Sequence, residues 1–61
     1  MTVGENIRKM RKIRGMTQAE LGKKIGVSYQ QIGQYENGKR NPKLQTIAKI
    51  AVALDVLLLD L

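Results

Sequence analysis

The sequence predicts an all-α fold, a single compact domain built from five short helices. Apolar residues recur three or four positions apart along most of the chain, which is helical spacing, and no stretch alternates apolar with polar residues as a strand would. Glycine, or an asparagine-glycine pair, follows three of these stretches and is typical of a helix end. The chain has 61 residues, which allows one domain at most, and we place it over residues 1–61.

The first helix is predicted over residues 3–14. Val3, Ile7 and Met10 fall on one face. Three basic residues turn outward: Arg8, Lys9 and Lys12. Gly15 follows the last turn and is the expected stop, because glycine readily takes the left-handed conformation that ends many helices.

The second helix begins at Thr17. Its hydroxyl can cap the helix while Glu20, three residues later, reaches back to complete a capping box. Leu21 and Ile25 make the buried stripe, and Gly26 ends the helix after little more than two turns.

The third helix is capped by Ser28, and Gln31 stands in the reciprocal position of another capping box. Ile32 and Tyr35 form its buried stripe. The pair Asn37-Gly38 is a strong stop and turn signal.

A basic connector, Lys39-Arg40-Asn41-Pro42, leads to the fourth helix, and proline suits the start of a helix. The stripe of this helix is predicted at four positions: Leu44, Ile47, Ala51 and Leu54. Residues 55–61 are expected to form a short fifth turn or helix that returns three side chains to the core: Val56, Leu58 and Leu61.

Composition excludes several classes of chemistry. The chain has no cysteine and no histidine, so disulfides, zinc sites of the usual kind and catalysis by either residue are excluded. Its five carboxylates form no evident pair or cluster, and we expect neither an enzyme nor a metal or other cofactor. No signal peptide is visible, and the longest apolar runs, 50–54 and 56–59, are too short to cross a bilayer. A cytoplasmic protein without a membrane partner is therefore predicted.

The charge points to a polyanion. Eleven Lys/Arg residues against five Asp/Glu residues leave a net charge of +6, and nucleic acid is a natural partner of so basic a chain. Domains that are merely soluble are also often basic, so charge alone leaves that alternative open.

Residues 17–37 form a candidate helix-turn-helix unit, because only Gly26-Val27 separates two capped helices. So short a link forces the helices to cross steeply, and Gly22 stands where they would meet. Gly22 therefore indicates close approach of the two helices. The alternative is a tolerated glycine that costs about 1 kcal/mol relative to alanine.

The outward face of the third helix is predicted to carry four residues: Tyr29, Gln30, Gly33 and Gln34. Gln30 and Gln34 are four residues apart and share one face. A glutamine amide can form two hydrogen bonds with adenine N6 and N7 in the major groove. We therefore predict base reading by these two glutamines and by Tyr29, with Gly33 allowing the backbone to approach the groove. The alternative is that exposed glutamines are simply solvated.

Two places are predicted to hold phosphates on either side of the groove. The start of the second helix presents backbone N–H groups of Thr17, Gln18 and Ala19, an anion site. The end of the third helix offers Asn37, Lys39 and Arg40. Taken alone, Lys39 and Arg40 are read more simply as part of a solvated loop.

Four segments carry a family resemblance that covers essentially the whole chain: I-R-K-M-R (7–11), T-Q-A-E-L-G-K-K-I-G-V-S (17–28), Q-I-G-Q-Y-E-N-G-K-R-N-P (31–42) and I-A-V-A-L-D-V (50–56). The chain resembles the Cro/C1-type (phage repressor-like, XRE) helix-turn-helix family, whose lambda-repressor-like domain has five helices. The resemblance implies that the third helix enters the major groove and reads bases with Tyr29, Gln30 and Gln34.

The resemblance also implies how the domain holds DNA. Gln18 is expected to contact one phosphate and the loop from Asn37 to Arg40 the opposite backbone, and Ser28 is included among the predicted phosphate contacts. Arg11 and Glu36 occupy positions that often form an ion pair in the family. Such a pair would anchor the third helix and leave Arg11 near a phosphate.

The chain departs from the family pattern at Gly22, at Gly33 and at two leucines, Leu57 and Leu59, which replace residues that are usually polar. An exposed apolar patch at that end predicts an interface. Family repressors often dimerise there, so we expect a homodimer through residues 56–61 on a palindromic operator, with recognition helices about 34 Å apart. The alternative is that the chain is the N-terminal part of a longer protein, on which these leucines pack.

These observations together predict a sequence-specific, double-stranded DNA-binding transcriptional regulator, and the resemblance favours a repressor. The alternative is a protein-interaction module, antitoxin-like or coactivator-like, that retains the fold and binds DNA weakly. A membrane-active cationic peptide is disfavoured, because the basic residues are spread over several helices rather than gathered on one amphipathic face.

Overall fold

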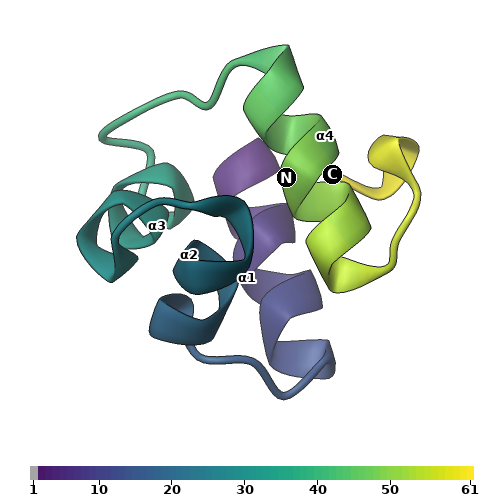
Figure 1. Cartoon of the computed structure of the whole chain (residues 1–61). Coiled ribbons are helices and arrows are strands. Elements are labelled where there is room, and N and C mark those ends of the chain that lie inside the picture. The colour runs from purple at the N-terminus through teal and green to yellow at the C-terminus, as the bar shows by residue number, and fades with distance from the viewer. Residues whose placement is uncertain (1) are drawn as a thin grey trace.

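The computed structural model describes residues 2–61, so Met1, the first residue of the predicted domain, lies outside the described residues. The described chain forms four α-helices and one short 3₁₀ helix (Figure 1). Their bounds are α1 Val3–Ile13, α2 Gln18–Ile25, α3 Tyr29–Glu36, α4 Leu44–Leu54 and η1 Leu58–Asp60. The all-α prediction is confirmed, but the fifth helix is only a 3₁₀ turn. None of the described helices is long and apolar enough to span a membrane.

Side-chain caps are present at the first three helices, and those at α2 and α3 were predicted. Thr17 and Glu20 form the predicted capping box of α2, and Thr2 and Glu5 form one at α1. Ser28 caps α3 by accepting from the Gln31 backbone N–H at 3.2 Å. The predicted reciprocal bond from the Gln31 side chain is wrong. That amide donates instead to the Tyr35 hydroxyl at 2.7 Å, one turn along the same helix face, where it provides a partner for a buried phenol.

The helix stops also follow the sequence signals. Gly15 and Gly26 have φ values of 68° and 80°, in the left-handed region that glycine favours, and they follow α1 and α2. Arg14 forms the C-cap of α1, so this helix ends one residue earlier than expected. Pro42 lies two residues before the start of α4 rather than in its first turn, and the N-cap of α4 is Lys43.

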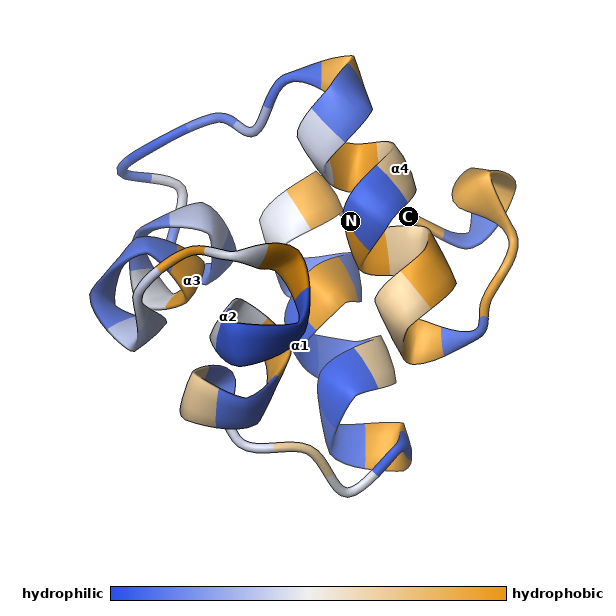
Figure 2. Cartoon of the chain, viewed as in Figure 1, coloured by the Kyte–Doolittle hydropathy of each residue, from blue (hydrophilic) through white to orange (hydrophobic). Residues whose placement is uncertain are grey.

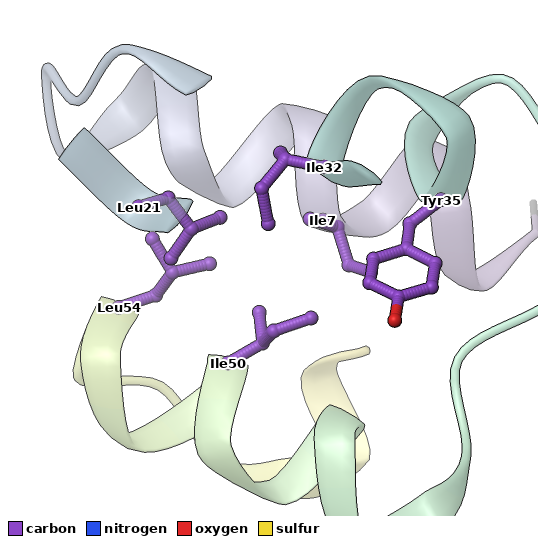
Figure 3. Packing of buried hydrophobic residues seen from close by; sticks show 6 residues of the cluster. All are labelled: Ile7, Leu21, Ile32, Tyr35, Ile50 and Leu54. Carbon is purple, nitrogen blue, oxygen red and sulfur yellow. The ribbon is translucent and has the colours of Figure 1, made fainter. Parts of the chain in front are cut away.

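A single hydrophobic core joins the four α-helices. Figure 3 shows the six side chains at its centre: Ile7, Leu21, Ile32, Tyr35, Ile50 and Leu54. Of the four positions predicted for the stripe of α4, Ala51 and Leu54 are buried and Ile47 is half-buried, whereas Leu44 is wrong and Ile50 was missed. Leu44 is 70% exposed, whereas Ile50 is fully buried. The buried positions of α4 are 50, 51 and 54, and Ile47 one turn earlier is only half-buried, so Leu44 lies beyond the end of that contact.

The segment after α4 folds back beside that helix, and Figure 2 shows it as a largely apolar stretch. Val56 and Leu61 pack against the core as predicted. Leu58 does not return to the core and is exposed together with Leu57 and Leu59. A full α-helix does not form here. The Asp60 carboxylate accepts from the Leu57 N–H at 3.3 Å, and backbone bonds from residue i+3 to residue i close a tight turn.

The crossing of α2 and α3 explains Gly22. An alanine Cβ at this position would lie 2.5 Å from the carbonyl oxygen of Val27, at the turn between the two helices. The close approach indicated by the sequence is therefore present. A second close approach, missed by the sequence analysis, brings Gly4 of α1 against the carbonyl oxygens of Tyr35 and Glu36 at the end of α3.

Candidate nucleic-acid interface

The candidate site is the solvent face of α3, with the segments that flank it. Ile32 and Tyr35 point into the core, so Tyr29, Gln30 and Gln34 are left exposed on the other side of the helix. Neither Gln30 nor Gln34 makes a side-chain hydrogen bond to residues 2–61. Figure 2 shows α3 and the connector after it as largely polar. Both amides are thus free to donate and accept toward a ligand.

Gly33 does not share this open face. It is half-buried, and a Cβ on it would lie 3.6 Å from the Gln18 side-chain nitrogen. Gly33 therefore leaves room for the Gln18 amide. Its predicted role, close approach of the helix backbone to a groove, stays a prediction.

Three helices meet at a buried ion pair behind this face. Arg11 of α1 donates to Glu36 of α3 twice, from Nε at 2.7 Å and from Nη2 at 3.1 Å. Gln18 of α2 donates to the same carboxylate at 3.1 Å. Arg11 is 8% exposed and Glu36 is 9% exposed. The pair implied by the family resemblance is therefore present, and it fixes the end of α3 to both preceding helices.

The guanidinium of Arg11 is also tied to the loop between α1 and α2, through a bond from Nη1 to the Met16 carbonyl oxygen at 2.8 Å. Three of its N–H groups thus donate within the protein, which leaves two of the five. The Gln18 amide has one N–H left after its bond to Glu36. Phosphate contacts by Arg11 and Gln18 stay predictions that rest on these remaining donors.

The start of α2 offers fewer free donors than expected. The Thr17 N–H donates to the Glu20 carboxylate at 3.0 Å, and the Thr17 hydroxyl accepts from the Glu20 N–H at 3.0 Å. The prediction of a free Thr17 N–H is wrong, because the capping box uses that group. Within the described chain, the N–H groups of Gln18 and Ala19 remain without a partner.

The capping box has an electrostatic consequence. The backbone N–H and the hydroxyl of Thr17 hold the pKa of the Glu20 carboxyl below its usual 4.5. Thr2 acts in the same way on the pKa of Glu5. Both glutamates are therefore ionised at neutral pH, and their charge stabilises the positive end of the helix.

The loop after α3 presents two cations in an ordered turn. The Asn37 side-chain oxygen accepts from the Lys39 N–H at 2.9 Å, and the Arg40 N–H donates to the Gln34 carbonyl oxygen at 3.2 Å. Gly38, which stands between Asn37 and Lys39, has a φ of 81°. Lys39 and Arg40 are exposed, and neither side chain has an ion-pair partner among residues 2–61. The Asn37 amide N–H groups and both cations can face a phosphate.

A hollow of about 300 Å³ lies between α1, α2 and α3 at the edge of this surface. It is lined by Arg8, Arg11, Gln18, Gly33, Glu36 and Asn37. Arg8 was predicted only to lie on the outward face of α1. The signal that could have placed it here is its spacing, since Arg8 stands three residues before Arg11 on the same helix.

Comparison with known protein families matches residues 7–61 to a helix-turn-helix family. An uncharacterised HTH-type transcriptional regulator of Sinorhizobium fredii is 39% identical over 54 residues, which cover 88% of this chain and 70% of that protein. The immunity repressor protein of Bacillus phage phi105 is 38% identical over 56 residues, which cover 92% of this chain and 39% of the repressor. The chain thus spans well under half of the phage protein.

Two solved structures share the fold. The restriction-modification controller protein C.AhdI of Aeromonas hydrophila superposes with a TM-score of 0.90 at 33% identity, over 95% of this chain and 84% of that one. The c2 repressor of phage P22, solved in complex with a synthetic operator, superposes with a TM-score of 0.87 at 34% identity, over 95% of this chain and 88% of that one.

Proposed function

The chain belongs to the Cro/C1-type helix-turn-helix family of transcriptional regulators, and on that premise we propose that it is a repressor that binds double-stranded operator DNA in a sequence-specific way. In this proposal α3 enters the major groove, and the segments on either side of α3 hold the sugar-phosphate backbone. The family is one of regulators rather than enzymes, which agrees with the prediction from composition.

One observation carries the proposal: Gln30 and Gln34 lie side by side on the exposed face of α3 with their amides unbonded within residues 2–61. Uncharged groups that both donate and accept can discriminate between base edges, whereas a lysine would be attracted to every phosphate. Tyr29 at the start of the same helix is exposed and is proposed as the third base-reading residue.

Phosphate binding is proposed at both ends of this face. The free N–H groups of Gln18 and Ala19 lie at the positive end of α2. Lys39 and Arg40 supply charge at the other end. The hydroxyls of Thr17 and Ser28 and the Asn37 amide are added as weaker, uncharged contacts, since helix capping uses one lone pair of each hydroxyl.

The test is to select bound duplexes from a random pool and then compare two variants on the selected sequence. We expect Gln30→Ala to weaken binding to the preferred sequence by roughly 1–3 kcal/mol and to relax the base preference at one position. Lys39→Ala should weaken binding to all sequences alike and reduce the salt dependence, because it removes a phosphate contact and no base contact.

Gln45→Ala is the matched control for Gln30, since Gln45 is an exposed glutamine on α4. It should leave affinity and base preference unchanged. If Gln30→Ala and Lys39→Ala have the same effect on every sequence, base reading by Gln30 is wrong, whatever the total loss of affinity.

We also propose that the operator is palindromic and that the chain binds it as a homodimer through residues 56–61. The exposed Leu57 and Leu59 support this, because large apolar side chains grouped on a surface favour association. The selected duplexes test the proposal directly. A consensus with two-fold symmetry and half-sites about one helical turn apart is expected, and a single asymmetric half-site would contradict it.

The same leucines favour the second candidate, a protein-interaction module with weak DNA binding. A titration with random duplex DNA at decreasing salt separates the two functions. A regulator of this charge should bind random DNA at low salt, since neutralisation of phosphates supplies most nonspecific affinity. No binding at any salt concentration would favour the interaction module.

A further inference from the structure

A second surface of the molecule has the features of a docking site. An open groove of about 700 Å³ runs between the end of α2 and the C-terminal half of α4. Its lining is apolar, from Ile25, Ala48, Val52 and Ala53, and it carries a lysine on each helix, Lys24 and Lys49. Val52, a large aliphatic residue within α4, is 81% exposed. None of the residues that bear on base reading or phosphate binding lines this groove.

The chemistry of the groove defines what it can bind. An apolar floor favours aliphatic side chains, and the two lysines favour an adjacent carboxylate. No carboxylate lines the groove, and the ion pair found among residues 2–61 is the one between Arg11 and Glu36. Lys24 stands four residues after Glu20 on α2, so Lys49 is the lysine with no acidic neighbour at helical spacing.

One exposed segment of the chain itself matches these requirements. Leu57 and Leu59 are 71% and 94% exposed, and the carboxylates of Asp55 and Asp60 flank them. The other exposed aliphatic residues outside the groove have basic neighbours: Ile13 stands between Lys12 and Arg14, and Leu44 follows Lys43. These would be repelled by Lys24 and Lys49, whereas residues 57–60 would be attracted.

We propose that the groove receives residues 57–60 of a second copy of this chain, with Leu57 and Leu59 on its apolar floor and Asp60 beside Lys49 or Lys24. The segment and the groove both lie near the C-terminal end of α4, since residues 57–60 follow that helix after two residues and Val52 and Ala53 lie in its last turn. Two copies can therefore exchange the contact reciprocally, which closes a dimer. The proposal rests on the homodimer proposed above and specifies the surface that receives the leucines.

Charge-reversal variants, measured alone and as a mixture, test this pairing in the absence of DNA. Self-association of the 61-residue chain is measured by analytical ultracentrifugation. The double variant Lys24→Glu/Lys49→Glu and the variant Asp60→Lys should each weaken association by roughly tenfold, because each places like charges opposite one another. An equimolar mixture should associate about as well as the unmodified chain, since both of its reciprocal contacts then join opposite charges.

Two controls keep the result specific. Lys9→Glu/Lys12→Glu changes the net charge by the same amount on the exposed face of α1 and should leave association unchanged. Asp60→Asn removes the charge but keeps an oxygen that can accept from the Leu57 N–H, so it separates the loss of charge from the loss of the 3₁₀ turn. Thermal unfolding of every variant is measured to check that each one is folded.

The outcomes divide cleanly. Recovery of association in the mixture supports the proposal. If Leu57→Ser/Leu59→Ser abolishes association while Lys24→Glu/Lys49→Glu does not, the dimer stands and its placement in this groove is wrong. A chain that stays monomeric at all concentrations overturns the pairing and leaves the groove to an acidic segment of another protein, while base reading by Gln30 is tested independently.

Discussion

At the scale of single residues, the ion pair between Arg11 and Glu36 connects three helices behind the candidate reading face. It is nearly excluded from water, its geometry is bidentate, and Gln18 adds a third bond to the same carboxylate. Such a pair gives little net stability compared with apolar residues of similar size, but an unpaired member left behind in the interior is costly. Its main effect is to hold the end of α3, and hence the candidate reading face, against α1 and α2.

This predicts an asymmetry between single and double substitutions. Arg11→Met should lower the free energy of unfolding by about 3–5 kcal/mol, because it leaves the Glu36 carboxylate buried without its cation. Arg11→Met/Glu36→Leu should recover most of that loss, since no buried charge remains. Urea unfolding followed by circular dichroism measures both. A double variant as unstable as Arg11→Met would show that the pair itself stabilises the fold.

At the scale of the elements, the two helices of the helix-turn-helix unit have the same length and carry a glycine at the same place. Gly22 is the fifth residue of α2, and Gly33 is the fifth residue of α3. Their surroundings differ. A Cβ at Gly22 would press on the backbone of the turn, whereas a Cβ at Gly33 would make an ordinary contact with the Gln18 side chain. Helix propensity is thus equal at the two sites, and packing is not.

Alanine substitution should therefore have opposite effects at these positions. Gly33→Ala is expected to raise the free energy of unfolding by up to about 1 kcal/mol, through helix propensity. Gly22→Ala should lower it despite the same gain, because the Val27 carbonyl must move and α2 and α3 must separate. Thermal unfolding of the two variants provides the comparison. A stabilised Gly22→Ala variant would show that the crossing can relax at little cost.

At the scale of the whole molecule, contacts distant in sequence hold α1 and the residue after it against the end of α4 and the C-terminal residue. Arg14, after α1, donates to the carbonyl oxygens of Leu54 and Asp55 at 2.8 Å each, where α4 ends. The Asn6 side chain donates to the Leu61 carbonyl oxygen at 3.1 Å.

The helix starts add local stability that depends on pH, through the ionised Glu5 and Glu20 in their capping boxes.

The sign of this pH dependence follows from the two lowered pKa values. A carboxyl whose pKa is lower in the folded chain than in the unfolded chain contributes stability above the usual value of 4.5. That contribution is lost as the pH falls from 4.5 through the lower folded value. We expect NMR titration of the side-chain carboxyls to show both pKa values below 4.5. Thr17→Ala should raise the pKa of Glu20 and leave that of Glu5 unchanged; equal titration of Glu20 in both proteins would contradict the role of Thr17.

Much of the fold could be predicted because its signals are local. The cap at Thr17, the stops at Gly15 and Gly26 and the apolar spacing of α1 to α3 each depend on residues within a few positions of one another. The exposed faces follow from the same spacing. For this reason the sequence alone determined four of the five predicted helices, the helix-turn-helix unit and the outward position of Gln30 and Gln34, together with the basic charge that favours a polyanion.

Only the tertiary structure decided features that depend on which helices meet and where their contacts end. Ile50 rather than Leu44 fills the core, Gly4 lets the backbones of α1 and α3 touch, and Arg14 caps a helix forty residues later. The groove at Val52 belongs to this class as well. Periodicity assigns a side chain to a face of its helix, but burial and partners are set by the neighbouring helices, whose positions no local pattern contains.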